Sequence, residues 1–545
     1  MNKRAGLTAV LVAAREGHYK TATCQNSADM FPVEKIKDAL KKYWGYDAFR
    51  PKQEAIVCDI LAGRDVCVVM PTGGGKSLCY QLPSALQSDK TAIVVSPLIA
   101  LMQDQVVQLK QMGIPAAALN SSLGWNEQRE IERRAEAGDY RLLYLSPERL
   151  AKREMIQWLQ KLAISFFVID EAHCISEWGH EFRPDYRELK LLRKEFPRKP
   201  IAAFTASATQ RVRHDIIEQL QLKDPGKFIA SFHRPNLNYQ VLECNSQTQE
   251  EQLVAILRKH KGSPVIVYSP TIKRVSTTVD TLKEEGIAAI GYHAKMDAAE
   301  RAKNQTRWME DEVNVLVGTV AFGLGINKPD VRAVVHLSLP KSIEQYYQEA
   351  GRAGRDGKQA DCVLLWQKRD TALLTHFIEQ IEDEAEKARG WQRYRDITGF
   401  ASAKQCRHKR ICAHFGEAPK WEKCFTCDIC SGTIAALPPD SDAPPLLRAY
   451  QRERKRKKPA VLATMRVESD LAVLKALKNW RLARAREDVL PAFVIFHDSV
   501  LAEISAVKPR TLEALCGIKG IGENKLARYG EEILRVVAKV TAHAN

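Results

Sequence analysis

The stretch DVCVVMPTGGGKS, residues 65–77, runs from an apolar segment through a glycine-rich turn to Lys-Ser. A short apolar segment bounded by turn residues predicts a buried strand, and a helical stretch follows Ser77. The glycines let backbone N–H groups close around phosphate oxygens, and the N-terminus of the next helix adds a favourable dipole. Met70 stands where the general pattern begins with glycine, but the order strand, loop, helix still predicts a nucleotide-binding α/β domain. Lys76 would reach the β- and γ-phosphates and Ser77 a magnesium ion, so the residues expected to hold the nucleotide here are Thr72, Gly73, Gly75, Lys76 and Ser77.

The alternation of apolar strands and helical stretches continues from about residue 30 to residue 365. Strands that alternate with helices indicate parallel sheets, and the segment SFHRPNLNY (231–239) divides the span into two halves of similar pattern. The sequence therefore predicts two α/β domains, at 30–230 and 231–365. Their predicted strands include DVCVVM (65–70), TAIVVSP (91–97), RLLYLSP (141–147), SFFVID (165–170), PIAAFTAS (200–207), PVIVYS (264–269), VNVLVGT (313–319) and RAVVHL (332–337).

The length and charge of the chain point to a multidomain protein with an anionic partner. The 545 residues suggest three to four domains. A formal charge of +16 favours nucleic acid as the partner, although a solvated basic surface would have the same composition. Most of the 13 cysteines stand singly in apolar segments, as is typical of a reducing compartment. No apolar run reaches the roughly 18 residues of a membrane span. We expect a cytoplasmic, nucleoid-associated protein. We also expect residues 1–29 to be poorly ordered.

Two carboxylates and two arginines complete the predicted hydrolytic site. Asp170 and Glu171 end a second apolar strand, where one acid can hold magnesium and the other can position or activate the attacking water. A pair of helix-capping acids is the alternative. In QEAGRAGRDG (348–357), Arg352 and Arg355 lie three apart and would share one helix face. If the second domain closes over the nucleotide they can act as arginine fingers; the alternative is a surface salt-bridge face.

Further nucleotide contacts are expected from two segments outside the loop. YWGYDAFRPKQ (43–53) carries Arg50 and Gln53, and a glutamine amide can read adenine through N6 and N7. Gln348, at the start of the arginine-bearing segment, is assigned to the same site.

The cysteines Cys406, Cys424, Cys427 and Cys430 have the spacing C-x17-C-x2-C-x2-C. Four thiolates, three of them closely spaced, suit tetrahedral zinc, and no position is left open for water. The zinc would therefore be structural. Cys412 and His408 lie close enough in sequence to compete with Cys406, and chance clustering or a disulfide is the alternative.

Together these segments resemble the RecQ family of superfamily 2 DNA helicases over roughly residues 30–430. The resemblance implies two RecA-like domains with ATP in the cleft between them, then a helical zinc-binding module at 366–433. A Pro-rich and then basic linker follows at 434–465, and an all-α block at 466–545 resembles the HRDC domain. The segments that carry the resemblance are FRPKQ (49–53), PTGGGKS (71–77), SPLIALMQDQ (96–105), DEAHCISEWGHEFRPDY (170–186), GTVAFGLGINKPDVR (318–332), YYQEAGRAGRDG (346–357) and, for HRDC, PAFVIFHDSVLAEI (491–504) with GIKGIGENKLARYG (517–530).

In the family, the stretch after Glu171 is an aromatic-rich loop that senses single-stranded DNA and couples it to hydrolysis. An aromatic face that stacks on a base contributes about 1–3 kcal/mol and tolerates any sequence. The resemblance implies that His173 relays between the two sites. Simple packing of the loop is the alternative. The residues expected to contact or couple to DNA are Trp178, His180, Phe182 and Arg183, with Ser96, Gln105 and Thr319 holding the DNA backbone.

The sequence departs from the family in three places. Thr205-Ala206-Ser207 replaces Thr-Ala-Thr, and Ile272 stands where an arginine is expected. Between Cys430 and the HRDC-like block, about 35 residues are too few for the winged-helix domain of many relatives.

The basic run at 452–458 could touch DNA or only be solvated. GIKGIG (517–522), with Lys519 and Lys525, could bind a phosphate or form a helix-packing corner.

We predict an ATP-, magnesium- and zinc-containing DNA helicase that moves 3′ to 5′ on single strands and separates duplex DNA in recombination and repair. Its expected partners are single-stranded and forked or tailed duplex DNA, with single-strand-binding and repair proteins possible, and the chain would be monomeric. The first alternative is a DNA-stimulated ATPase, translocase or annealing factor with weak unwinding, because the winged helix is missing. A non-catalytic DNA-binding scaffold and an RNA helicase are the others.

Overall fold

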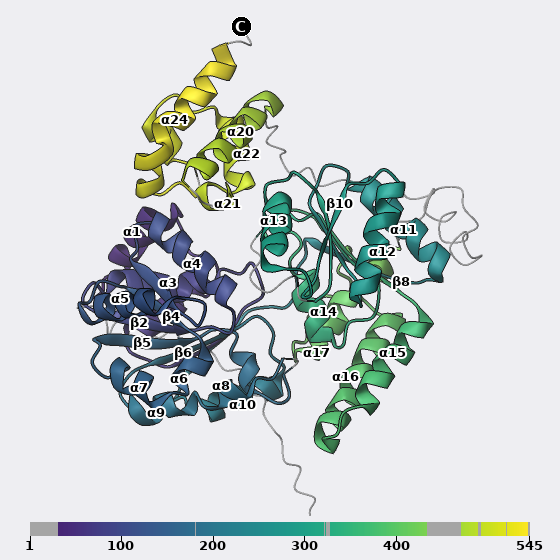
Figure 1. The fold of residues 1–545 in the computed structure, drawn as a ribbon, viewed down its shortest axis with the longest axis horizontal. Coiled ribbons are helices and arrows are strands. Elements are labelled where there is room, and N and C mark those ends of the chain that lie inside the picture. Colours follow the sequence, from purple (N-terminus) through teal and green to yellow (C-terminus); the bar gives the residue numbers. More distant parts are fainter. Residues whose placement is uncertain are drawn as a thin grey trace, which may run out of the picture.

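The computed structural model describes residues 31–179, 181–320, 322, 328–432, 470–488, 492–518 and 520–542 (Figure 1). The N-terminal extension and the linker predicted at 1–29 and 434–465 therefore lie outside the described residues, as do His180 and Lys519. Two parallel sheets, a zinc-binding module and a helical C-terminal domain follow one another along the chain, which confirms the predicted fold class.

The first sheet has seven parallel strands in the order β3-β4-β2-β5-β6-β1-β7. Its central strands are buried along their whole length, as expected of a parallel sheet covered on both faces. The carboxyl ends of parallel strands meet at one edge, where α/β proteins bind ligands. The strands are β1 (Val66–Val69), β2 (Thr91–Val95), β3 (Ala116–Leu119), β4 (Leu142–Leu145), β5 (Ile164–Ile169), β6 (Ile201–Thr205) and β7 (Gly226–Ile229).

Helices cover both faces of this sheet because alternate strand residues point in opposite directions. Val66 and Val68 of β1 share a core with α2, α3 and α4, whereas Cys67 and Val69 share one with α7 and α10. The helices of this domain are α1 (Val33–Trp44), α2 (Gln53–Leu61), α3 (Lys76–Leu86), α4 (Ile99–Gln111), α5 (Trp125–Glu136), α6 (Pro147–Leu150), α7 (Arg153–Leu159), the 3-10 turn η2 (Ala172–Ile175), α8 (Pro184–Arg187), α9 (Lys190–Glu195) and α10 (Gln210–Gln219).

The second sheet has six parallel strands in the order β10-β11-β9-β12-β13-β8. Helices α11 and α12 pack on one face, and α13 and α14 on the other. The elements are β8 (Leu237–Glu243), α11 (Ser246–Lys259), β9 (Val265–Tyr268), α12 (Ile272–Glu284), β10 (Ala289–Tyr292), α13 (Ala298–Met309), β11 (Val315–Gly318), β12 (Ala333–His336), α14 (Ile343–Ala350) and β13 (Ala360–Trp366).

The zinc-binding module continues the second domain without a separate core. Ile397 and Phe400 of α16 and Ile411 and Phe415 near α17 join the apolar cluster under α14. The Phe415 ring stacks on Phe232, with ring centroids 4.2 Å apart. The module contains α15 (Lys368–Glu379), α16 (Glu384–Ser402), α17 (Arg407–His414) and α18 (Asp428–Ser431).

The C-terminal domain has an apolar core of its own. It sits beside α1 and α13 in Figure 1. Its helices are α20 (Leu471–Glu487), α21 (Ala492–Ile495), α22 (Asp498–Val507), α23 (Leu512–Cys516) and α24 (Glu523–Ala542). No helix among the described residues is both long and apolar enough to cross a membrane.

All eight strands predicted from the sequence are present, within a few residues of their predicted ends. The structure adds β3, β7, β8, β10 and β13. The burial of β7 alternates between half-buried and exposed residues, which is typical of an edge strand and gives a weak apolar signal.

Candidate active site

The glycine-rich loop lies between β1 and α3, as predicted. Gly73 and Gly75 have φ values of +79° and +84°, a left-handed conformation that residues with a Cβ rarely adopt. A Cβ on Gly75 would also lie 2.4 Å from Nε2 of Gln53. Helix α3 begins at Lys76, so the loop presents the helix N-terminus and its free N–H groups to the carboxyl edge of the sheet.

Arg50 and Gln53 hold the back of this loop. Nη1 of Arg50 donates to the Gly73 carbonyl. The Gln53 amide donates to the carbonyls of Gly74 and Gly75 at 3.2 and 3.3 Å, and its oxygen accepts from the Arg50 backbone N–H. The Gln53 amide is therefore committed to the loop, and it would have to release these carbonyls to read adenine.

Asp170 and Glu171 follow β5 at the same edge of the sheet. Asp170 is only 8% exposed, and Tyr186 donates to its backbone carbonyl at 2.9 Å. Burial and the neighbouring Glu171 raise the pKa of Asp170 to about 7, against the opposing effect of Lys76. Asp170, buried beside the partly exposed Glu171, offers the oxygen donor and the negative charge that a Mg²⁺ site needs. Glu171 itself has φ +47°, a strained value for a residue with a side chain.

His173 connects Glu171 to the next strand. Its Nδ1 lies 2.9 Å from Oγ1 of Thr205 and 3.3 Å from Oε2 of Glu171. Burial lowers the pKa of His173, but Cys174 and Glu171 outweigh this and raise it to about 10. The imidazole thus lies between the second acid and the Thr205-Ala206-Ser207 segment, and its role as a relay to the aromatic loop stays a prediction.

Two hydrogen bonds join the loop to the second domain, and a third joins a neighbouring segment of the first domain to it. Oγ1 of Thr72 donates to the Gly351 carbonyl at 3.0 Å, and Arg234 donates to the Thr72 carbonyl at 3.0 Å. Gln348 donates from Nε2 to Oγ of Ser207 at 2.9 Å, so it contacts the neighbouring segment of the first domain. The cleft between the two sheets is therefore bridged directly at the phosphate loop.

Arg352 and Arg355 lie in the turns that follow α14, which ends at Ala350, so they do not share a helix face as predicted, and they have different neighbours. A Cβ on Gly73 would lie 3.3 Å from Cγ of Arg355, so Arg355 packs against the phosphate loop. Burial, followed by Arg352 and Arg234, lowers the pKa of Arg355 to about 9. Arg352 lies beside the Tyr268 hydroxyl, and its buried Nε has no hydrogen-bond partner among the described residues. Clustered, buried guanidinium groups fit a polyphosphate.

The aromatic loop leaves directly from η2. Trp178 and Phe182 are each 38% exposed. Few other large apolar side chains among the described residues are exposed to this extent. The guanidinium of Arg187 lies 5.7 Å from the Phe182 ring centroid. Arg183 donates to the Pro97 carbonyl at 3.3 Å and to Glu181 at 3.0 Å. Trp178, Phe182 and Arg183 lie on this one loop, and their contact with DNA stays a prediction.

Ser96 and Gln105 are placed differently from what we expected of residues that hold a DNA backbone. Ser96 is buried, and its hydroxyl has no partner among the described residues. Gln105 is also buried and accepts from Gln81 at 2.7 Å. Gln105 is buried where α4 packs against α3, and Ser96 follows β2, where its N–H donates to the Leu145 carbonyl at 3.1 Å; the contact of either residue with DNA stays a prediction. Thr319 lies at the end of β11, where its N–H donates to the Tyr292 carbonyl at 3.2 Å.

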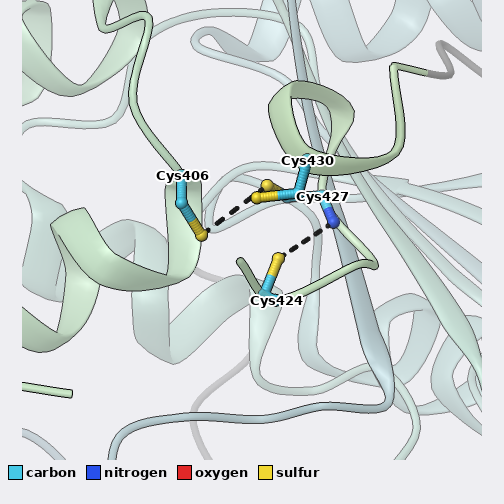
Figure 2. A group of neighbouring side chains, drawn as sticks. All are labelled: Cys406, Cys424, Cys427 and Cys430. Carbon is cyan, nitrogen blue, oxygen red and sulfur yellow. Dashed lines mark hydrogen bonds between the residues drawn. The ribbon is translucent and has the colours of Figure 1, made fainter. Parts of the chain in front are cut away.

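The four predicted zinc ligands form one cluster at the base of the zinc-binding module (Figure 2). Their sulfur atoms all lie within 4.8 Å of one another, and Cys406 and Cys427 are 3.9 Å apart. Two sulfurs bound to one tetrahedral zinc lie about 3.8 Å apart, so the geometry fits this ion. His408 contacts the Leu237 carbonyl at 3.0 Å instead, and neither it nor Cys412 belongs to the cluster.

Sequence reasoning missed three arginines that surround these sites. Arg234 lies in SFHRPNLNY, which we used only to divide the two domains, although a cation there was a visible signal. Arg211 on α10 and Arg389 on α16 both approach the Trp178 ring. Nothing in the local sequence of either helix indicates this contact.

Lys525 is not placed as a phosphate ligand. Its Nζ donates to the Ile495 carbonyl at 2.9 Å and lies 5.2 Å from the Phe496 ring centroid. Burial lowers its pKa to about 8. In this conformation the Lys525 side chain contacts its own domain, which favours the helix-packing alternative at this residue.

Comparison with known families gives four consecutive matches. The DEAD/DEAH box helicase family matches residues 50–216, and the helicase conserved C-terminal domain matches 248–357. The RecQ zinc-binding family matches 368–431, and the HRDC domain matches 470–537.

Solved structures of low identity share the two-domain fold. Mss116p bound to single-stranded RNA and AMP-PNP has a TM-score of 0.53 at 16% identity, with 73% of this chain and 90% of that chain covered. The helicase MrfA bound to DNA and AMPPNP has a TM-score of 0.52 at 20% identity, with 63% and 52% covered.

Close relatives in sequence carry the name ATP-dependent DNA helicase RecQ. The protein of Pasteurella multocida is 32% identical over 599 residues, which cover 92% of this chain and 93% of the relative. That of Bacillus subtilis is 32% identical over 587 residues, which cover 93% and 98%. That of Haemophilus influenzae is 42% identical over 391 residues, which cover 72% and 62%. The chain therefore belongs to the RecQ family of superfamily 2 helicases and carries the family's zinc-binding module and a C-terminal HRDC domain.

Proposed function

We propose that this protein is an ATP-dependent DNA helicase that moves 3′ to 5′ along single-stranded DNA and separates duplex DNA. The observation that carries the proposal is the direct continuity of Asp170 and Glu171 with the loop that exposes Trp178. DNA that binds this loop can move the acids of the hydrolytic site through only seven residues of chain. The names of the relatives that align along nearly the whole chain support DNA as the substrate.

The residues of the cleft divide the work of hydrolysis. Lys76 and the N–H groups at the start of α3 bind the phosphates, and Ser77 and Asp170 would hold Mg²⁺, which supplies charge neutralisation for the departing phosphates. Glu171 positions the attacking water. His173 holds the Glu171 carboxylate at a fixed position relative to the segment that contains Ser207. Arg355 belongs to the second domain and stabilises the negative charge on the phosphates. Hydrolysis therefore requires that the two domains stay joined at Thr72 and Gln348.

Coupling to DNA follows from the same connections. A base that stacks on Trp178 shifts the loop, and the loop begins at η2, which carries His173. Because His173 contacts both Glu171 and Thr205, this shift reaches the water-positioning acid and the Ser207–Gln348 bond together. DNA binding can then set both the hydrolytic geometry and the closure of the two domains.

The sequence-based alternative, a translocase with weak unwinding, is not favoured. This alternative rested on the missing winged helix. However, relatives that are named helicases align with 92–93% of this chain. We further propose that the protein acts as a monomer in recombination and repair, in the cytoplasm and on the nucleoid, and that single-strand-binding and repair proteins are its partners. The basic charge of +16 supports nucleic acid as the principal partner.

Unwinding of three labelled duplexes tests the proposal: one with a 3′ tail, one with a 5′ tail and one forked. We expect ATP-dependent separation of the 3′-tailed and forked duplexes only. Glu171→Gln is the control and should lower DNA-stimulated ATP hydrolysis at least 100-fold while nucleotide binding persists. Strong DNA-stimulated hydrolysis by the wild type without strand separation would instead identify a translocase, and equal stimulation by RNA would remove the preference for DNA.

A further inference from the structure

The HRDC domain contacts the first RecA-like domain through one short segment, residues 520–524, which we call the docking segment. The Gly520 N–H donates to the Gly45 carbonyl at 3.3 Å, at the turn that ends α1. Nδ2 of Asn524 donates to the Met112 carbonyl at 2.5 Å, at the end of α4. Two turns of the first domain therefore accept hydrogen bonds from the docking segment.

Glycines on both sides of this contact allow the two backbones to approach. A Cβ on Gly522 would lie 2.6 Å from the Lys42 carbonyl oxygen and 3.0 Å from that of Tyr43. The three atoms nearest to that position all belong to the first domain. Gly45, in turn, would place a Cβ 2.7 Å from the Ile521 backbone nitrogen. Gly522 does not have a positive φ, so the contact with the first domain is the reason for glycine there.

A second group of contacts joins the HRDC domain to the other RecA-like domain. Nζ of Lys478 on α20 lies 3.9 Å from Asp311 and 2.5 Å from Asp498 of its own domain. Asp311 also pairs with the buried Lys328 at 3.0 Å. Asp330 of the second RecA-like domain lies beside Lys328, and Asp498 of the HRDC domain is near it. The charges at this junction are therefore balanced by groups from both domains. The HRDC domain thus contacts both halves of the motor.

The docking segment has little left to offer a phosphate in this position. The Gly520 amide already donates to Gly45, and the face of Gly522 is opposed by two carbonyl oxygens, which repel an anion. Lys525 is turned into the HRDC core. The groups that a phosphate would need are therefore occupied by this chain's own first domain.

We propose that residues 520–524 serve to fasten the HRDC domain to the motor and not to bind DNA. The first domain supplies backbone carbonyls at Lys42, Tyr43 and Gly45, which the glycines of this segment approach closely, and at Met112, which the Asn524 side chain reaches. This role goes beyond the helicase activity and does not depend on it, because it concerns the position of one domain on another.

The test is small-angle X-ray scattering of the full-length Gly522→Ala variant without nucleotide or DNA, with single-strand binding measured by fluorescence anisotropy. The three atoms nearest to the added methyl all belong to the first domain, so the HRDC domain should separate and the radius of gyration should rise by about 2–4 Å. Gly517→Ala is the matched control, because its Cβ would meet only ordinary contacts of 3.5 Å and longer inside the HRDC domain. Asn524→Ala, which removes one bond to the Met112 carbonyl, is an independent second variant.

We expect a larger radius for Gly522→Ala, a wild-type radius for Gly517→Ala, and a single-strand affinity of Gly522→Ala that is equal to or higher than that of the wild type. An unchanged scattering curve for both Gly522→Ala and Asn524→Ala would overturn the proposal. A loss of single-strand affinity in Gly522→Ala would also overturn it, since the segment would then be a DNA contact. Circular dichroism of all variants separates release of the domain from its unfolding.

Discussion

The guanidinium of Arg211 lies over the ring of Trp178, with Cζ 3.1 Å from the ring centroid. Arg389 of the zinc-binding module approaches the same ring at 5.3 Å. Arg389 also pairs with Glu177, the residue before the tryptophan, at 3.6 Å. The loop that should stack on DNA is therefore held by cations from two domains, and a base must displace at least part of this arrangement to reach the ring.

Removal of Arg389 should make the loop easier for DNA to engage. A cation over an aromatic ring contributes about 0.5–1 kcal/mol at an exposed site. In Arg389→Ala, the concentration of single-stranded DNA that half-maximally stimulates ATP hydrolysis should fall about 2- to 5-fold, with hydrolysis in the absence of DNA unchanged. A coupled ATPase assay over a DNA titration measures both quantities.

The matched control is Arg393→Ala, one turn further along the same helix, which removes a pair with Glu386 but no contact with Trp178. It should behave as the wild type. If Arg389→Ala needs more DNA and not less, Arg389 itself is a DNA contact, and the restraint argued from its position over the ring is wrong.

The two arginines of the cleft should differ in their effect on hydrolysis. Arg355 packs against Gly73 of the phosphate loop, whereas Arg352 lies beside Tyr268. Arginine fingers contribute 10³ or more to the rate in well-studied phosphoryl transferases. Arg355→Ala should therefore lower kcat at least 100-fold and more than Arg352→Ala does, while fluorescent ADP still binds. A larger loss in Arg352→Ala would exchange the two roles.

Cys427 should be required for zinc and Cys412 should not. Both are buried, but only Cys427 belongs to the four-sulfur cluster. Bound structural zinc contributes of the order of 10 kcal/mol to folding, so Cys427→Ser should lose most of its zinc and unfold the module at a lower temperature. Cys412→Ser should keep the metal. Elemental analysis and thermal melts decide, and full zinc content in Cys427→Ser would contradict the ligand set.

His497 should make the HRDC domain less stable in mild acid. Burial, followed by Lys525 and Arg481, lowers the pKa of His497 to about 4. Because the folded form resists protonation, this contribution to stability is complete above the unfolded pKa of about 6.5 and is lost as the pH falls from there toward 4. The loss is at most about 3 kcal/mol.

Calorimetry of the full chain at pH 7.5 and pH 5 would measure this effect as a lower unfolding temperature of the HRDC transition at pH 5. His497→Asn keeps a good capping residue at the start of α22 without a titrating ring, so its transition should shift less with pH. The same shift in both proteins would mean that another group is responsible.

The eight predicted strands were recognisable because a parallel sheet covered on both faces leaves an apolar run in the sequence, although β13, which is also buried throughout, was missed. TAIVVSP and PIAAFTAS each gave a strand with every residue buried. β7 and β10 were missed for the opposite reason: both lie at a sheet edge and are partly exposed, so their signal is weak.

Some features of the candidate site were likewise predictable from the sequence, and others were not. Loop and ligand residues close in sequence, such as Lys76 with Ser77 or Cys427 with Cys430, follow from spacing, because a short segment fixes their relative positions. Ser96 and Gln105 belong to one local motif, yet both are buried, and for Gln105 the packing of α4 against α3 decides this.

The sequence by itself determined the order of the domains, the parallel α/β class, the phosphate loop with its two acids, and the four cysteines of the zinc cluster. The phosphate loop, the pair of acids and the run Cys424–Cys430 are each local patterns, carried by residues close together in the sequence. Only the tertiary structure decided that Arg211 and Arg389 hold Trp178, that Arg355 and not Arg352 lies on Gly73, and that Gly522 faces the Lys42 carbonyl. Such contacts join segments tens to hundreds of residues apart, and they depend on how whole helix and sheet faces pack, which no local spacing records.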